Sequence, residues 1–306
     1  MRVGAVCLLM LGAAPLTAQA QASRAASQPE GARLVTSDVT TFWEIFDRAS
    51  HEELASLLRT HYLETGPPAL RDFIPYRILS ADSLAALVIR QRGRYEAARA
   101  ASLRVEELER EIRAAWYALE YLYPYATFPD TYFVIGRFNS GGTASPRGAI
   151  IGAEMLPDPL EIPRLVAHEL VHFQQPPVPP AQRTLLAQVI REGAADFIAE
   201  LVTGRAPSAP YMAYGYENEA ELWQELSPLL PAANAAGWLY GGQPSGRPAD
   251  LGYFFGYRIA ETYYTAAEDK RKAVSDIVNV RDYTDFLRRS GYDPARDARQ
   301  SDAPRL

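Results

Sequence analysis

The most restrictive feature of the sequence is a predicted helix that a run of prolines brings to an end. Pro163 suits the first turn of this helix, where its missing N–H would have no helical partner. The proline-rich stretch at 176–180 cannot continue a helix, so the helix should end after Gln175. A second helix is predicted over roughly 183–203, and Gly204 suits its C-cap. The chain should therefore turn back within a few residues and start an antiparallel helix.

The first of these helices carries two histidines with a glutamate beside one of them. His168 and His172 are four residues apart, a rotation of about 400° that places both imidazoles on one face. Two nitrogens in that arrangement can reach one Zn²⁺ at about 2.0–2.1 Å. Glu169 falls beside such an ion rather than on it, where its carboxylate can take a proton from water acidified by the zinc. The pattern therefore predicts a zinc site with a general base.

A catalytic zinc site needs a third protein ligand and one open position. The upstream histidines, His51 and His61, are interpreted as ordinary surface or core residues because they lie far from the pair. The following helix offers Glu192, Asp196 and Glu200 at helical spacing, although a solvated position is more typical of Glu200. A carboxylate from this helix is therefore expected to complete the site.

The two helices together resemble the gluzincin group of zinc metallopeptidases, which includes the thermolysin-like enzymes. The resemblance rests on His168-Glu169-x-x-His172 followed by Glu192-x-x-x-Asp196. It implies that Glu192 is the third ligand of one Zn²⁺ and that Asp196 hydrogen-bonds His168 and fixes its tautomer. A ligating imidazole needs such a partner on general grounds as well. The chain is also similar to a poorly characterised group of bacterial exported proteins predicted to be zinc proteases.

The resemblance leaves the group that stabilises the oxyanion open. Thermolysin-like enzymes use a downstream histidine, but no histidine follows His172. Other gluzincins use a tyrosine, which makes Tyr253 and Tyr257 candidates for this catalytic role. Alternatively, these two residues and Tyr264 form an aromatic stripe in the core. Arg258 is a further candidate, although a structural ion pair is its more ordinary role.

The rest of the chain predicts a mostly helical α+β fold with a small sheet before the histidine-bearing helix. Helix formers dominate 81–120, and helical spacing also marks 37–46 and 51–64. TYFVIGRF (131–138) and AIIGAEML (149–156) are rich in β-branched, aromatic or apolar residues. These two segments predict a hairpin or a pair of neighbouring strands.

The segment between the predicted strands, 139–148, is predicted to be a loop. Its NSGG sequence is not a phosphate-binding loop, because it lacks the lysine of the nucleotide motif and does not open onto a helix. Resemblance to the zincins implies that AIIGAEML is the edge strand, which would line the cleft and pair with an extended substrate.

We expect one zincin-like metallopeptidase domain over 37–306, with helical lobes on either side of the sheet. Its N-terminal helical part spans 37–125, and its C-terminal helical part spans 205–306. The sheet and the zinc-binding helices lie between them, over 126–204. No internal repeat is visible.

The N-terminus predicts export. Arg2, an apolar run and a small-x-small site at Ala18-Gln19-Ala20 indicate a signal peptide over 1–20, and a small polar linker follows over 21–36. The single cysteine, Cys7, lies inside this signal, so the mature chain has no disulfide and no thiolate metal site. No later segment is apolar enough for a transmembrane helix. The expected location is the periplasm or the exterior of a bacterial cell.

The charge of the chain excludes some classes of partner. With a net charge of -6 and no basic cluster, the sequence argues against nucleic-acid binding. A peptide or protein substrate is expected, and the sequence leaves the oligomeric state open. The alternatives to a hydrolase are a catalytically inactive zincin-like metal-binding or scaffold protein of the cell envelope, and a metal-free helical binding module. Glu169 favours the hydrolase, because a protein that only binds metal needs no base at that position.

Overall fold

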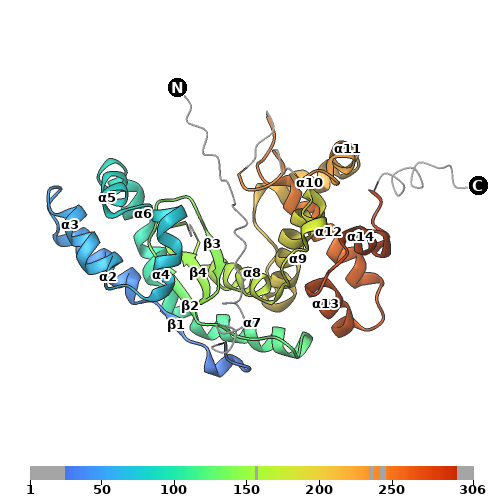
Figure 1. Ribbon diagram of the computed structural model, residues 1–306, viewed down its shortest axis with the longest axis horizontal. Helices are drawn as coiled ribbons and strands as arrows, with labels where there is room; N and C mark the ends of the chain where they lie inside the picture. The colour runs from blue at the N-terminus through green and yellow to red at the C-terminus, as the bar shows by residue number, and fades with distance from the viewer. Residues whose placement is uncertain (1–24, 156–157, 234–236, 242–245, 295–306) are drawn as a thin grey trace, which may run out of the picture.

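The computed structural model describes residues 25–155, 158–233, 237–241 and 246–294, and the structural statements below refer to these residues. The fold is α+β and mostly helical, with one small sheet near the middle of the molecule (Figure 1). Most helices from the N-terminal part of the chain lie on one side of this sheet, and helices from the C-terminal part lie on the other. The helix over 109–122 is the exception, because it runs below the sheet toward the C-terminal helices. This arrangement confirms the predicted fold class.

Short helices form the N-terminal lobe. They are α2 (Ser37–Arg48), α3 (Leu54–Leu58), η3 (Arg59–Leu63), α4 (Pro68–Phe73), η4 (Ile74–Ile78), α5 (Ala81–Arg90), α6 (Arg92–Leu103), η5 (Val105–Leu108) and α7 (Glu109–Leu122). The turns η3 and η4 are π-helical. The apolar face of α2 is buried at Phe42, Trp43 and Phe46, and Trp43 Nε1 donates a hydrogen bond to Ser102 Oγ of α6 at 2.9 Å. Apolar burial and this bond hold the lobe together.

The strongly helical stretch predicted over 81–120 is divided in the structure. α5 ends at Arg90, and Gln91 has a non-helical ψ of 32° before α6 begins. A second break at Arg104 separates α6 from η5 and α7. Helix propensity is favourable along the whole segment, but the breaks let each helix turn and bury its own apolar side chains.

The sheet has four strands in the described part of the chain. These are β1 (Leu34–Val35), β2 (Thr131–Val134), β3 (Gly142–Ser145) and β4 (Gly148–Gly152), in the order β1-β2-β4-β3. β2 is parallel to both β1 and β4, whereas β3 and β4 form an antiparallel hairpin. Because β2 and β4 are buried throughout, their sequences are not alternately polar and apolar.

The strand pairing confirms the prediction of neighbouring strands and corrects two other expectations, the loop over 139–148 and the edge strand. The segments 131–138 and 149–156 do contain neighbouring strands, but these pair in parallel and not as a hairpin. The hairpin partner of β4 is β3, which lies inside the predicted loop 139–148. β1 and β3 are therefore the edge strands, and the expectation for AIIGAEML is wrong because β4 is paired on both sides. Strand order depends on contacts between distant segments, which local residue patterns do not contain.

The predicted signal peptide, 1–20, lies outside the described residues, and the predicted linker over 21–36 is described only from residue 25. The described part includes the 3-10 turn η2 (Pro29–Gly31) and the strand β1. The backbone N–H of Arg33 donates to Asp130 Oδ1 at 2.9 Å, beside the pairing of β1 with β2. This segment is therefore part of the sheet rather than a free connection.

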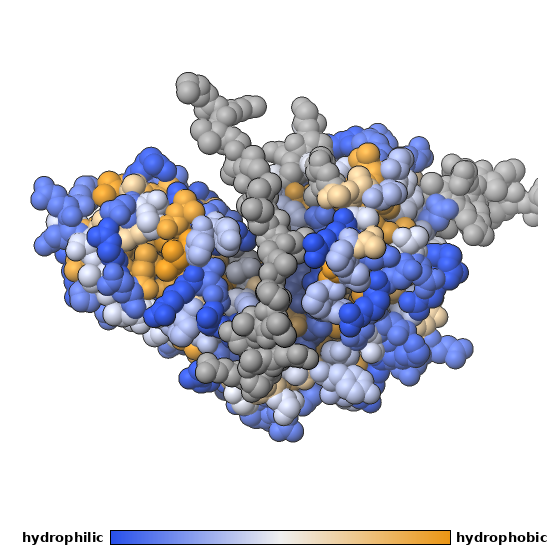
Figure 2. Space-filling view, in the orientation of Figure 1, coloured by the Kyte–Doolittle hydropathy of each residue, from blue (hydrophilic) through white to orange (hydrophobic). Residues whose placement is uncertain are grey.

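The central and C-terminal helices follow the sheet. They are η6 (Ala153–Met155), η7 (Pro159–Glu161), α8 (Ile162–Gln174), η8 (Pro180–Gln182), α9 (Leu185–Thr203), α10 (Pro210–Glu217), α11 (Glu219–Leu226), η9 (Ser227–Leu229), α12 (Leu251–Ala266), α13 (Lys270–Val278) and α14 (Tyr283–Ser290). On the face shown in Figure 2, hydrophobic residues gather most densely on the N-terminal lobe, at left. None of the described helices has the length and apolar character that crossing a membrane requires.

Two glycines bring α9 and α12 into backbone contact. A Cβ on Gly256 would lie 1.8 Å from the carbonyl oxygen of Val189, and a Cβ on Gly193 would lie 2.0 Å from the nitrogen of Tyr257. No side chain fits into either space, because real Cβ atoms do not approach backbone atoms so closely. This contact fixes α12, and with it Tyr253, against the helix that carries Glu192 and Asp196.

Candidate metal centre

The ends of α8 and α9 are set by local signals. α8 ends at Gln174, and Gln175 has an extended ψ of 131° before the prolines. α9 begins after Thr184, whose hydroxyl accepts the N–H of Ala187 at 3.3 Å. It ends at Thr203, and its C-cap Gly204 has a φ of 68°. These ends lie close to the predicted ones, and the two helices pack against each other.

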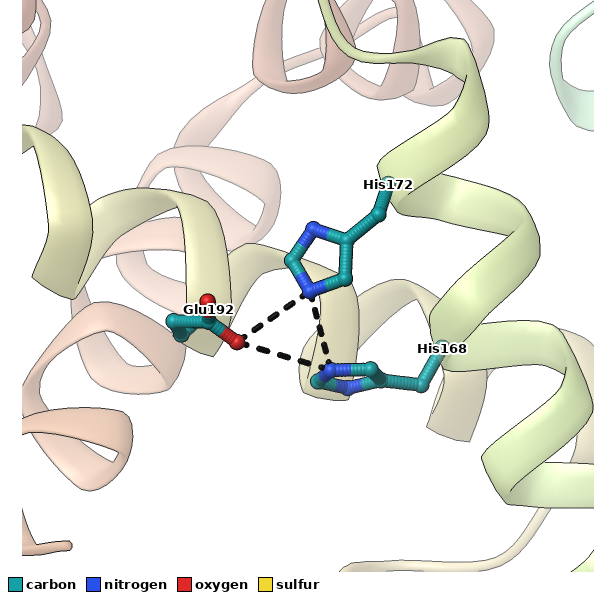
Figure 3. A group of neighbouring side chains, drawn as sticks. All are labelled: His168, His172 and Glu192. Carbon is teal, nitrogen blue, oxygen red and sulfur yellow. Dashed lines mark hydrogen bonds and ion pairs between the residues drawn. The ribbon is translucent and has the colours of Figure 1, made fainter. Parts of the chain in front are cut away.

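Three ligand atoms converge between these helices (Figure 3). His172 Nε2 lies 3.0 Å from His168 Nε2 and 3.1 Å from Glu192 Oε2. His168 Nε2 lies 3.6 Å from the same oxygen of Glu192. A tetrahedral ion with bonds of about 2.0–2.1 Å separates its ligand atoms by about 3.3 Å. The three measured distances bracket that value, so the spacing fits one zinc-sized ion.

The other nitrogen of each histidine fixes the proton position. His168 Nδ1 lies 2.9 Å from Asp196 Oδ1, which can only accept a hydrogen bond when it is ionised. His172 Nδ1 lies 2.9 Å from Gln175 Oε1. Gln175 presents this oxygen to the histidine because its amide nitrogen donates to the carbonyl of Arg191 at 3.0 Å. Both Nδ1 atoms therefore carry hydrogen, and both Nε2 atoms have a free lone pair in the neutral rings.

With both rings neutral, two lone pairs and a carboxylate oxygen face one another at these distances, an arrangement that either a bound cation or an added proton on a histidine stabilises. Burial alone lowers the pKa of His168, but Asp196 and Glu192 outweigh it and raise that pKa to about 10. Burial alone raises the pKa of Glu192, whereas the two histidines hold it well below its usual range. The site thus favours positive charge, and two imidazoles with one carboxylate are a donor set that suits Zn²⁺.

Asp196 is itself held by two residues that the sequence reasoning missed. Arg164 Nη1 donates to Asp196 Oδ1 at 2.9 Å, and the hydroxyl of Tyr211 donates to Oδ2 at 2.7 Å. Burial raises the pKa of Asp196, but His168, Arg164 and Tyr211 together lower it below its usual range. Asp196 is 2% exposed, so it forms an ionised, fully hydrogen-bonded support for His168.

Two further residues of the site were also missed. The hydroxyl of Tyr240 donates to Glu192 Oε1 at 3.2 Å, and Gln175 fixes His172 as described above. Gln175 had a usable signal, since it lies three residues after His172, on the side where the helix ends. Tyr240 had none, because it is part of a segment rich in Pro, Gly and Tyr without periodicity. Its backbone has a φ of 58°, an uncommon value for a tyrosine.

Glu169 lies beside the cluster without joining it. Its side chain packs against Gly142 at the start of β3, and the residue is 6% exposed. No described residue hydrogen-bonds its carboxylate. Burial raises its pKa, although His168 and His172 act against that rise, as does the more distant charge of Arg77. A carboxylate with a raised pKa, next to a metal site and without a fixed partner, is suited to accept and release a proton.

The structure separates the two candidate tyrosines. The ring of Tyr253 stacks on that of His168, with centroids 6.5 Å apart, and no described residue hydrogen-bonds its hydroxyl. The hydroxyl of Tyr257 donates instead to Glu200 Oε2 at 2.9 Å. Because Glu200 follows Glu192 by eight residues, this hydrogen bond lies about 12 Å beyond Glu192 along the axis of α9. Tyr257 is therefore not brought to the cluster, because α12 presents its two tyrosines to different neighbours.

The remaining aromatic and charged candidates have structural partners. Tyr257 and Tyr264 both contact the ring of Phe197, at centroid distances of 5.5 and 5.4 Å. The proposed aromatic stripe thus exists for these two residues. Arg258 pairs with Glu219 at 2.8 Å and with Glu261, which fits the structural interpretation of this arginine.

Comparison with known proteins gives one match. Residues 139–283 match the family described as "Predicted Zn-dependent protease (DUF2268)". The matched segment extends from the loop before β3 to the start of α14 and so includes the whole histidine and carboxylate cluster. No curated protein and no solved structure matches the chain. The description of the family agrees with the zinc-type donor set of the cluster.

Proposed function

We propose that this protein is a zinc-dependent peptide hydrolase in which His168, His172 and Glu192 hold one Zn²⁺. The observation that carries the proposal is the convergence of their three ligand atoms, 3.0 to 3.6 Å apart, with both Nδ1 protons already committed elsewhere. A metal-free helical module has no use for such an arrangement. The match to a predicted zinc protease family supports the same conclusion.

Glu169 is the proposed general base. Zn²⁺ bound at the three ligands supplies a Lewis acid that acidifies water and polarises the scissile carbonyl. The carboxylate of Glu169 takes one proton as water adds to that carbonyl. It then delivers this proton to the amine nitrogen that leaves when the C–N bond breaks, so the base is regenerated. The raised pKa of Glu169 favours the first step, because a carboxylate of higher pKa is a stronger base.

Tyr253 is the proposed oxyanion donor. Its hydroxyl is unengaged among the described residues, and its ring is fixed between those of Tyr211 and His168. Burial, followed by the charge of Glu192, raises the pKa of Tyr253 well above its usual value. The phenol therefore remains protonated near neutral pH and can donate a hydrogen bond to an oxygen that becomes negative.

The edge strand β3 is the proposed substrate-binding strand. It pairs with β4 on one side only, so its other edge can form backbone hydrogen bonds with an extended peptide. Its first residue, Gly142, contacts Glu169, so a peptide on that edge would pass close to the proposed base. Export through the N-terminal signal, to the periplasm or the cell exterior, is part of the same proposal.

The function can be tested with zinc-loaded protein and a mixture of peptides that vary in length and sequence. We expect cleavage that a chelator abolishes and added zinc restores. Glu169→Gln should lower kcat by about 10²- to 10⁴-fold, the usual contribution of a general base. Glu200→Gln, which removes a glutamate outside the cluster, is the control and should change little. Zinc binding without cleavage of any peptide would favour the inactive metal-binding or scaffold protein.

A further inference from the structure

The space around Gly142 has no room for a side chain. A Cβ built on this residue would lie 2.4 Å from Oε1 of Glu169, 2.7 Å from its Cγ and 2.8 Å from its Cδ. All three distances are too short for non-bonded carbon and oxygen atoms. The backbone of Gly142 is not in the left-handed region that favours glycine. Space, and not backbone conformation, is therefore what requires glycine at this position.

The backbone on the other side of this contact is anchored. The hydroxyl of Ser140 donates to the carbonyl of Gly142 at 2.9 Å, and the N–H of Gly152 donates to the carbonyl of Gly141 at 3.0 Å. The hairpin register pairs Gly142 with Ile151. A side chain at position 142 would therefore displace the carboxylate of Glu169 more readily than it would displace the strand.

We propose that Gly142 is a positioning residue for the general base, an inference that rests on the proposed hydrolytic function. The carboxylate of Glu169 has no hydrogen bond to any described residue, so packing, including the contact with Gly142, holds it in place. The same contact holds the base and the edge strand at a fixed separation. A peptide paired with β3 is thereby placed at a defined distance from Glu169. The NSGG segment thus acquires a role that its sequence alone does not reveal.

The kinetic test compares Gly142→Ala with Gly141→Ala. The neighbouring position is a matched control, because a Cβ on Gly141 meets only Leu165, at an ordinary 3.8 Å. A shift of the base by about 1 Å can lower a rate by about 100-fold. We expect kcat of Gly142→Ala to fall by about that factor, with KM changed less than about twofold and zinc content unchanged. Gly141→Ala should remain within about twofold of the wild type in all three quantities.

A second test does not depend on catalysis. Gly142→Ala should lower the unfolding midpoint by a few degrees, because it forces an extra methyl group against Glu169. In a Glu169→Ala background the methyl group has space, so most of that loss should disappear. Equal losses in both backgrounds, or a loss of zinc in Gly142→Ala, would overturn the inference.

The two tests also separate this inference from the proposed function. If no peptide is cleaved by the wild type but the stability coupling is present, the contact is real and the hydrolase proposal fails. If Glu169→Gln abolishes cleavage while Gly142→Ala behaves like Gly141→Ala, the hydrolase stands and the positioning role of Gly142 is wrong.

Discussion

The two halves of the proposed site are built in opposite ways. On the metal side, each ligand is held by a second residue: His168 by Asp196, His172 by Gln175, and Glu192 by Tyr240. On the base side, Glu169 packs against Gly142 of β3 and forms no hydrogen bond to a described residue. The ionised carboxylates Glu192 and Asp196 have lowered pKa values, whereas that of Glu169 is raised.

The difference follows from what each half has to do. A metal ligand works best when its lone pair is aimed in one direction, so hydrogen bonds to its other atoms are useful. A general base must take up and release a proton, so a strong permanent partner would hold it in one state. Steric contact with a glycine can fix the place of a carboxylate without fixing its protonation state.

The largest effect is expected for a metal ligand. His172→Ala removes one of three donor atoms, so the protein should lose its zinc and its peptide cleavage should fall to background. Zinc content after dialysis and cleavage rate are the measurements. His61→Ala, which replaces an exposed histidine of the N-terminal lobe, should leave both unchanged. Full zinc occupancy in His172→Ala would show that the metal side is wrongly assigned.

The next largest effect is expected for Tyr253, which is neither a metal ligand nor the proposed base. Tyr253→Phe removes only the unengaged hydroxyl, so zinc binding should persist while kcat falls by about 10²- to 10³-fold, as for other oxyanion donors. Tyr257→Phe is the matched control on the same helix. A larger loss of kcat in Tyr257→Phe than in Tyr253→Phe would contradict the assignment of Tyr253 as the oxyanion donor.

A smaller effect is expected where the support of a ligand is weakened. Asp196→Asn keeps the shape of the side chain but removes its negative charge. That charge attracts three donors, which are the Nδ1–H of His168, the guanidinium of Arg164 and the hydroxyl of Tyr211. Zinc affinity should fall by about 10- to 100-fold, measured by competition with a chelator of known affinity. Asp276→Asn, on α13, serves as a control. Unaltered affinity would mean that hydrogen bonds behind the ligands contribute little.

The smallest effect concerns a buried carboxyl group outside the site. Glu154 is 3% exposed, and one of its oxygens has no hydrogen-bond partner in the described structure. Burial raises its pKa from 4.5 to about 7. Because the folded state binds this proton more tightly, the stabilisation is present below pH 4.5 and is lost as the pH rises toward 7. Between pH 5 and pH 8, the unfolding midpoint of the wild type should therefore fall a few degrees more than that of Glu154→Gln. The same pH dependence of the unfolding midpoint in both proteins would contradict the raised pKa of Glu154.

The sequence predicted the parts of the site that lie on two helices. His168, Glu169 and His172 share one turn of α8, and Glu192 and Asp196 share one face of α9, so helical geometry alone relates them. Tyr211 comes from α10, Tyr240 from a loop-rich segment and Gly142 from an edge strand. Their positions depend on how the chain folds back over the two helices. The strand order was missed for the same reason, because the apolar runs of β2 and β4 do not indicate which strand lies at the edge.

In the proposed site three side chains hold the metal, and a fourth, adjacent to them, does not. This division is tested most directly by the zinc content per chain of the wild type, Glu192→Ala and Glu169→Gln after identical zinc loading and dialysis. We expect one zinc in the wild type and in Glu169→Gln, and almost none in Glu192→Ala. A wild type without zinc, or zinc retained in Glu192→Ala but lost from Glu169→Gln, would show that these roles are wrongly assigned.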